Sequence, residues 1–200
     1  MRRTDCEGKD PKEMEAVLAR AEWGTLGLVS PQGTPVLVPV NFVFHQGQVV
    51  FHGAQAGEKS DLIRAAPQAS FLVVEAYAPI PSYAFSPVDA CPATQFFQSV
   101  LVKGSVAPVE DLERKAGALD ALMRKLQPEG GYEPIRADSP TYQASLRGVA
   151  VFALACREMT MKIKLGRQLS PGSRDKVEEA LRARGGPEDR RTLKAMGDPA

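Results

Sequence analysis

The stretch "VPVNFVFHQGQVVFHGAQAGEKSDLIRAAP", residues 38–67, decides the predicted fold of this chain. Two apolar runs, residues 38–44 and 49–53, flank the polar turn "HQGQ", which is typical of an antiparallel β-hairpin. The second arm enters a Gly-x-Lys-Ser turn and a short helix-forming segment that ends before Pro67. So short a connection leaves no room for the long crossovers that parallel strands require.

The same pattern extends along the rest of the chain. Short hairpin turns join most of the apolar runs, and helix-forming segments lie between or beside them. The expected strands are 23–30, 35–44, 49–54, 69–77, 94–109 and 148–156, with a continuation at 159–165. The expected helices are 11–22, 58–66 and 110–126, and 78–92 and 127–146 are expected to be irregular loops. These elements predict a mainly β (α+β) protein built on an antiparallel barrel of six strands with flanking helices.

Composition and charge narrow the class of protein. Lys and Arg total 25 against 24 Asp and Glu, so no broad positive field indicates a nucleic-acid partner. No apolar run reaches the ~18 residues of a membrane span, and no secretion signal is visible. The three cysteines lie far apart, without metal-ligand spacing, which favours a reduced, cytoplasmic protein with no metal site. Residues 1–166 are expected to form the barrel domain, and 167–200 a charged helical tail.

The Gly-x-Lys-Ser turn is a candidate phosphate cradle. Gly53 and Gly57 loosen the backbone, Ser60 is placed to cap the helix, and free N–H groups at a helix start attract anions. Lys59 would add an ammonium group, with Arg64 further along the helix. The alternative is an ordinary capped surface helix with a solvated lysine.

Polar residues within apolar strands are further candidates. His52 belongs to a strand that is predicted to be covered on both faces, where it would contact a ligand or be a hydrogen-bonded core histidine. Asn41 follows Pro39, which interrupts the ladder, so it would face a planar ring or satisfy a neighbouring strand end. Gln98 and Ser99 interrupt another apolar strand in the same way.

The run from Glu22 to Glu75 resembles the pyridoxamine 5′-phosphate oxidase-like, FMN-binding split β-barrel family, in the branch that includes the nitroimidazole-resistance reductases. "CPATQFFQSVLVKGSV", the helix after it, and "GVAVFALACREMTMKIKL" match the same branch, so the resemblance covers roughly residues 12–165. It implies a homodimer with two FMN molecules at the subunit interface. The cofactor-binding residues that it implies are Pro39, Val40 and Asn41 beside the flavin ring, Lys59 and Ser60 at the phosphate, and His52, Ser99 and Val100.

The resemblance also implies an activity. The expected function is an FMN-dependent oxidoreductase that passes electrons from a reduced nicotinamide donor to a small organic acceptor, nitroaromatic compounds included. His52 would be the catalytic residue, which protonates or orients the acceptor next to the ring. Two alternatives remain open: a haem-binding relative with His52 as an axial ligand, and a non-catalytic, flavin-binding regulatory protein.

Overall fold

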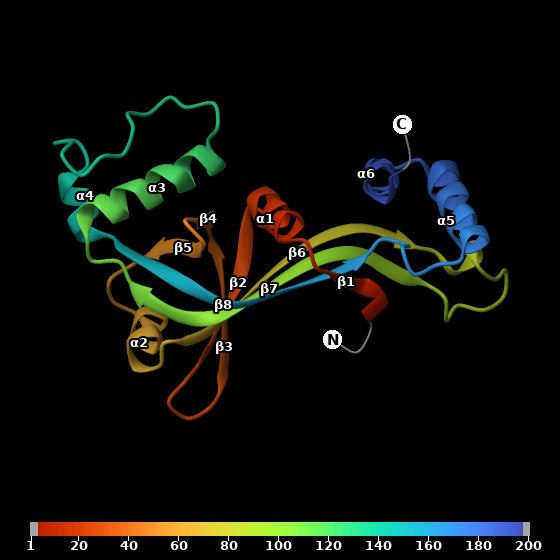
Figure 1. Ribbon diagram of the computed structural model, residues 1–200, viewed down its shortest axis with the longest axis horizontal. Helices are drawn as coiled ribbons and strands as arrows, with labels where there is room; N and C mark the ends of the chain where they lie inside the picture. The colour runs from red at the N-terminus through yellow and green to blue at the C-terminus, as the bar shows by residue number, and fades with distance from the viewer. Residues whose placement is uncertain (1–3, 198–200) are drawn as a thin grey trace. The chain divides into compact units, whose positions relative to one another are not determined.

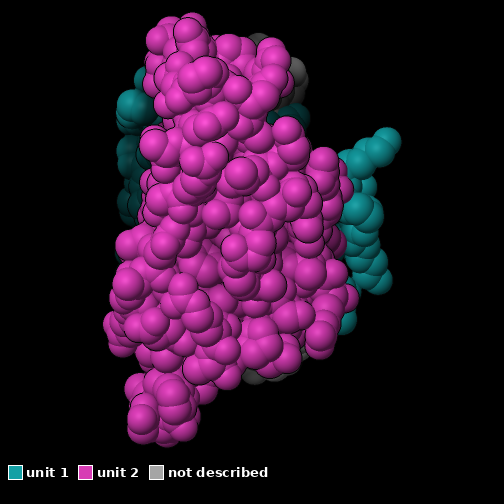
Figure 2. Space-filling view, turned by 90° about the vertical axis from the view of Figure 1, so that its left-hand side faces the viewer, with its two compact units in different colours: residues 1–13, 74–100, 160–200 teal, residues 14–73, 101–159 magenta. Residues whose placement is uncertain are grey.

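The computed structural model describes residues 4–197, and Figure 1 labels its elements. The chain forms two compact units that interleave along the sequence (Figure 2). Unit 1 comprises Met1–Glu13, Val74–Val100 and Thr160–Ala200, and unit 2 comprises Met14–Val73 and Leu101–Met159. Three long strands contribute residues to both units.

The elements follow the predicted order closely. The strands are β1 (Glu7–Gly8), β2 (Trp23–Val29), β3 (Pro35–Asn41), β4 (Val43–His45), β5 (Gln48–Gly53), β6 (Gln68–Ile80), β7 (Thr94–Pro108) and β8 (Ala150–Lys164). The α-helices are α1 (Pro11–Arg20), α2 (Glu58–Ala65), α3 (Leu112–Leu126), α4 (Gln143–Gly148), α5 (Pro171–Arg184) and α6 (Pro187–Met196). Two 3-10 helices, η1 (Thr4–Cys6) and η2 (Ser82–Ala84), complete the described chain.

The sheet order explains why the barrel is split. The strands run β3-β2-β6-β7-β8-β5-β4, with β1 paired to β8. β3 and β4 lie at opposite ends of this order, yet only Phe42 separates them in the sequence. The sheet must therefore curl until its two ends approach each other, and β3 indeed contacts β5. Because β3 is an edge strand, the missing N–H groups of Pro35 and Pro39 break no ladder on its open side.

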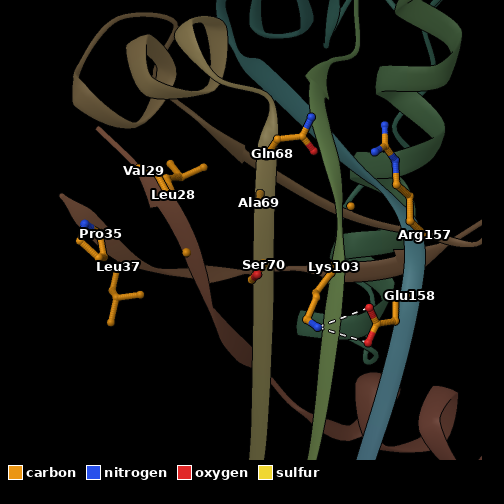
Figure 3. Close-up of a pocket in the computed structure, with 12 residues that line it drawn as sticks. Leu28, Val29, Pro35, Leu37, Gln68, Ala69, Ser70, Lys103, Arg157 and Glu158 are labelled. Carbon is orange, nitrogen blue, oxygen red and sulfur yellow. Dashed lines mark hydrogen bonds and ion pairs between the residues drawn. The ribbon is translucent and has the colours of Figure 1, made fainter. Parts of the chain in front are cut away.

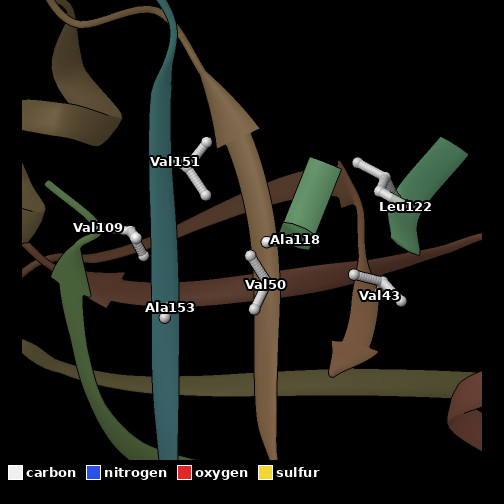
Figure 4. Packing of buried hydrophobic residues seen from close by; sticks show 7 residues of the cluster. All are labelled: Val43, Val50, Val109, Ala118, Leu122, Val151 and Ala153. Carbon is white, nitrogen blue, oxygen red and sulfur yellow. The ribbon is translucent and has the colours of Figure 1, made fainter. Parts of the chain in front are cut away.

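Helix α3 covers one face of the sheet in unit 2. Its Ala118 and Leu122 pack on valine and alanine side chains from β4, β5 and β8 (Figure 4). The cluster comprises Val43, Val50, Val109, Ala118, Leu122, Val151 and Ala153. On the opposite face, inside the curl, Phe42 and Phe71 meet edge to face at 4.7 Å, and Phe51 stacks on Phe152 at 5.6 Å.

In unit 1, helices α5 and α6 bind the end of β6 through side-chain hydrogen bonds. The Thr192 hydroxyl accepts a hydrogen bond from the backbone N–H of Ala78 at 2.8 Å. Arg191 pairs with Glu75 at 2.8 Å and lies over the Tyr77 ring. The charged C-terminal segment is therefore helical and docked on this strand.

The structure confirms the α+β fold with a curled antiparallel sheet and flanking helices. Within residues 4–197 the sheet has eight strands instead of six, because Phe42 separates β3 from β4 and the two-residue β1 is added. The expected loop 78–92 was partly wrong, since β6 continues to Ile80, and the loop 127–146 overlaps α4. The predicted domain boundary after residue 166 stays a prediction. None of the helices in the described part of the chain has the length and apolar character of a membrane span.

Candidate functional site

The turn between β5 and α2 brings three of the predicted site residues together. Lys59, in the first turn of α2, donates from its Nζ to the backbone oxygen of His52 at 3.3 Å. The same ammonium lies 5.6 Å from the centre of the Phe51 ring. Lys59 is half-buried and folds back over the strand that precedes it. Lys59 therefore has a defined contact with β5, and its role at a phosphate stays a prediction.

Two glycines allow this arrangement. A Cβ atom on Gly53 would lie 2.5 Å from the Lys59 Nζ, so any larger residue there would displace the ammonium. Gly57 is the N-cap residue of α2 and has a φ of 117°, a backbone conformation that favours glycine. The local sequence "GAQAG" thus permits the close return of Lys59 onto β5.

The prediction that Ser60 caps helix α2 was wrong. Its hydroxyl is buried and donates to the backbone oxygen of Ala54 at 2.7 Å, one residue past the end of β5. Gly57 occupies the cap position, and no side chain of residues 4–197 caps the N–H groups of the first turn. The helix start therefore keeps free donors beside Lys59.

Lys59 and His52 have altered pKa values. Partial burial lowers the pKa of Lys59. Loss of hydration, and secondly the positive charge of Lys59, lower the pKa of His52 from 6.5. His52 is exposed, whereas its strand neighbours Val49, Val50 and Phe51 are buried. The expectation that both faces of β5 are covered at His52 was wrong, and so was the core-histidine alternative.

Pro39, Val40 and Asn41 form the last part of β3. Val40 points into the core, whereas Pro39 and Asn41 are exposed. The Asn41 side-chain amide donates to the backbone oxygen of Glu22 at 3.0 Å, so it ties the end of β3 to the start of β2. This contact agrees with the strand-end alternative for Asn41 and leaves its side-chain oxygen available.

Ser99 and Val100 lie on β7, in unit 1. Ser99 is half-buried and Val100 is fully buried. Their neighbour Gln98 is buried and accepts a hydrogen bond from the Tyr77 hydroxyl at 3.3 Å. Gln98 thus has a partner within its own unit. The cofactor contacts implied for Ser99 and Val100 stay predictions.

An open face of the sheet in unit 2 carries a hollow of about 520 Å³ (Figure 3). Strand register places Trp23, Leu37 and Leu72 on this face, with exposed fractions of 60%, 71% and 40%. Lys103 and Glu158 form an ion pair at 3.2 Å in its wall (Figure 3). This face is apolar and uncovered. The alternation of polar and apolar residues in these strands did not predict an exposed apolar face.

Sequence reasoning also missed two lysines of α3. Lys115 is buried on the apolar stripe of the helix, three residues after Leu112 and four before Leu119. A charged residue on the apolar stripe of a helix was the sequence feature that could have indicated a buried lysine here. Lys125 donates to the backbone oxygens of Leu18 and Phe42 at 2.9 and 3.0 Å. Within residues 4–197 no group of three or more His, Cys, Asp or Glu residues is placed to hold a metal ion.

The curled, split sheet with helices on its faces is the architecture of a split barrel of the pyridoxamine 5′-phosphate oxidase type. The sequence model described as pyridoxamine 5′-phosphate oxidase matches residues 10–163. The chain belongs to that family. No curated protein matches it.

Solved structures agree with this fold at low sequence identity. A candidate 5-nitroimidazole antibiotic resistance protein from Bacteroides thetaiotaomicron is 21% identical, with a TM-score of 0.63, over 78% of this chain and 86% of that one. The flavocytochrome Anf3 from Azotobacter vinelandii is 21% identical, with a TM-score of 0.65, over 79% and 69%. A FAD and heme binding protein from Mycobacterium smegmatis is 19% identical, with a TM-score of 0.66, over 79% and 73%. At these identities the likeness concerns the fold alone.

Proposed function

We propose that this protein is an FMN-binding oxidoreductase that passes electrons from a reduced nicotinamide donor to a small organic acceptor, nitroaromatic compounds included. The observation that carries the proposal is the turn in which Lys59 folds back over β5, next to His52 and an uncapped helix start. Membership of the pyridoxamine 5′-phosphate oxidase family supports it. So do the names of the fold relatives, which mention FAD, heme and a flavocytochrome.

The residues of this turn fit a flavin phosphate. Lys59 contacts a backbone oxygen and an aromatic ring through its ammonium, and no carboxylate within residues 4–197 pairs with it. Free N–H groups at the start of α2 add donors that favour an anion. Lys59 would hold the phosphate, and Ser60 would keep the turn in place through Ala54.

The flavin, when bound, supplies the electron transfer itself, and the chain supplies binding and orientation. Pro39, Val40 and Asn41 would border the ring, and Asn41 is already oriented by its bond to Glu22. His52 would donate a hydrogen bond or a proton to the acceptor, because its imidazole is exposed on the strand next to Lys59. Ser99 and Val100 of β7 are the further cofactor contacts that the family resemblance implies.

The open face of unit 2 supports a homodimer with the cofactor at the subunit interface. Monomeric proteins rarely leave large contiguous apolar patches in water. Trp23, Leu37 and Leu72 share one face across three adjacent strands, and Leu37 also lines the hollow of about 520 Å³. A second copy of this chain would remove these side chains from water.

An absorption spectrum of the freshly purified protein, and of the supernatant after heat release, tests the proposal. Flavin absorption in both samples, with FMN identified in the supernatant by chromatography, is the expected result. Bleaching of that absorption by NADH or NADPH is expected next, because the proposal includes a nicotinamide donor. A colourless protein that also fails to bind added FMN contradicts the assignment.

The same spectrum decides a second function, haem binding with His52 as axial ligand. The lowered pKa keeps the His52 imidazole neutral at pH 7, the form that ligates iron. A Soret band that is lost in His52→Ala would establish haem binding and replace the flavin assignment. A bound flavin that no nicotinamide reduces would instead indicate a non-catalytic regulator.

A further inference from the structure

A second, smaller cavity of unit 2 lies beside helix α3. Its volume is about 200 Å³, and its polar lining residues are Gln55, Arg64, Glu110, Lys115 and Arg147. We call it the Lys115 cavity. Its apolar wall comes from the end of β7 and the start of β8. Lys59 is not part of its lining. The volume corresponds to about seven water molecules and is below the range of drug-sized ligands, so its occupant must be small.

The cavity has an excess of positive charge. Arg64, Lys115 and Arg147 line it with a single acid, Glu110, and Arg64 also pairs with Asp61, outside the lining, at 3.2 Å. Lys115 is only 7% exposed, and its Nζ donates to two backbone oxygens, those of Leu146 at 3.4 Å and Val149 at 3.2 Å. No carboxylate among residues 4–197 pairs with it. A buried ammonium without an opposite charge is unfavourable, and an anion in the cavity would remove that cost.

Hydrogen bonds between backbone and side chains organise the wall of the cavity. The Gln55 amide donates to the backbone oxygen of Arg147 at 2.7 Å, and Arg64 donates to the backbone oxygen of Gln55 at the same distance. These bonds connect the segment before α2 to the end of α4. Over the described residues, the guanidinium of Arg147 has neither a hydrogen-bond nor an ion-pair partner. Arg147 is therefore free to bind a ligand at a preformed wall.

We propose that the Lys115 cavity binds a small phosphate-class oxyanion, at a site that adjoins the segment before α2 but does not include Lys59 in its lining. Arg147 supplies a planar pair of donors that matches an oxyanion, and Lys115 supplies a buried point charge. Glu110 opposes the anion and limits its affinity. The ligand is either inorganic phosphate or the phosphate group of a small ester, since both present the same oxygens.

The experiment is isothermal titration of the full chain with sodium phosphate at constant ionic strength, with and without added FMN. We expect saturable binding in both conditions, and an affinity about tenfold or more weaker in Arg147→Ala, because a charge-assisted contact is lost. Glu110→Gln should bind phosphate more tightly than the unaltered chain. Arg114→Ala, an exposed arginine next to Lys115 but outside the lining, is the matched control and should bind unchanged.

Glycerol 3-phosphate in a parallel titration distinguishes the two sources. Tighter binding than inorganic phosphate assigns the site to an ester, and weaker binding assigns it to the free anion. Heats no larger than those of a chloride titration overturn the proposal. So does unchanged phosphate affinity in both Arg147→Ala and Glu110→Gln. An Arg147→Ala variant that loses FMN affinity as Lys59→Ala does would show that the cavity belongs to the flavin site, which also overturns it.

Discussion

At the scale of single residues, Lys59 is in an unfavourable position for a cation. It lies in the first turn of α2, where the helix dipole disfavours positive charge, and burial lowers the pKa of its ammonium. Its backbone contact at 3.3 Å compensates only in part. A bound phosphate would offset both effects, which is the physical basis of the proposed role of Lys59.

Replacing Lys59 with alanine should weaken FMN binding by about 1.5–3 kcal/mol, because a charge-assisted contact to the phosphate is lost. A fluorescence titration of the flavin-free apoprotein with FMN measures the effect. Lys176→Ala, an exposed lysine of α5, is the control and should bind FMN as before. Equal affinities in both variants would remove Lys59 from the cofactor site.

His52→Ala should alter turnover while leaving the free energy of unfolding at pH 7 within about 0.5 kcal/mol, since the side chain is exposed. The folded state lowers the pKa of His52, so the unfolded chain binds the proton more readily. The native protein should therefore lose stability as the pH falls from 6.5 through the lowered pKa of His52. The variant should lack this His52 contribution to the pH dependence of stability. Urea unfolding at pH 7.5 and 5.5, with His45→Ala as control, measures it. A variant that unfolds without ligand contradicts the surface role.

At the scale of elements, β7 and β8 approach closely at Gly104. A Cβ atom there would lie 1.8 Å from the backbone oxygen of Ala155, so the approach of the two strands requires glycine. β7 runs through this position from Thr94 to Pro108. The reason for the glycine is the neighbouring strand, which lies about fifty residues away in the chain.

Gly104→Ala should lower the free energy of unfolding by about 1–3 kcal/mol or more, because the two strands must separate. Gly117→Ala is the matched control, since its Cβ would meet nothing within 4 Å in the middle of α3. That variant should be about 0.5–1 kcal/mol more stable than the unaltered chain. Denaturant unfolding of both variants tests whether their free energies of unfolding change in opposite directions. A neutral Gly104→Ala would mean that the strands adjust without strain.

Lys125 connects three elements of unit 2. It lies near the end of α3 and donates to the backbone oxygens of Leu18, in the last turn of α1, and of Phe42, between β3 and β4. Its Nζ also lies 3.8 Å from the centre of the Phe42 ring. Phe42 interrupts the strand, so its backbone oxygen has no ladder partner there. Lys125 satisfies that oxygen at the point where the barrel splits.

Lys125→Met should cost about 1–3 kcal/mol, because two backbone oxygens lose their donor. Burial lowers the pKa of Lys125 to about 8 from 10.5, so between these values the unfolded chain binds more protons than the folded one. The stability of the native protein should therefore rise with pH across this window relative to the variant. Urea unfolding at pH 7.5 and 9.5 gives the difference. A difference that shrinks at the higher pH would contradict the assignment.

Local patterns were sufficient for most elements and insufficient for most contacts. The hairpin, the Gly-x-Lys-Ser turn and α3 follow from periodicity and turn residues, so their positions agree with prediction within a few residues. The exposure of His52 and the hydrogen bond of Ser60 could not be predicted from these local patterns. Both depend on which segments cover β5 and α2, and that is decided by residues distant in the sequence.

At the scale of the whole molecule, the open sheet face predicts self-association. Leu37→Glu places a charge on a side chain of this face that is 71% exposed, so burial in a dimer would become unfavourable. We expect a dimer for the unaltered chain and a monomer for the variant in sedimentation velocity. Val88→Glu, at a 93% exposed valine of unit 1, is the control and should remain dimeric. A monomeric unaltered chain would contradict the predicted homodimer.

The residue pattern specified the antiparallel strands, the flanking helices and the turn that carries Lys59, because these depend on neighbours within a few residues. Family resemblance then supplied the expected cofactor. Only the tertiary structure decided the split at Phe42, the exposure of His52, the uncovered face around Leu37 and the Lys115 cavity. Each of these arises where strands and helices far apart in the chain meet, and burial and charge there depend on all the segments that surround a residue.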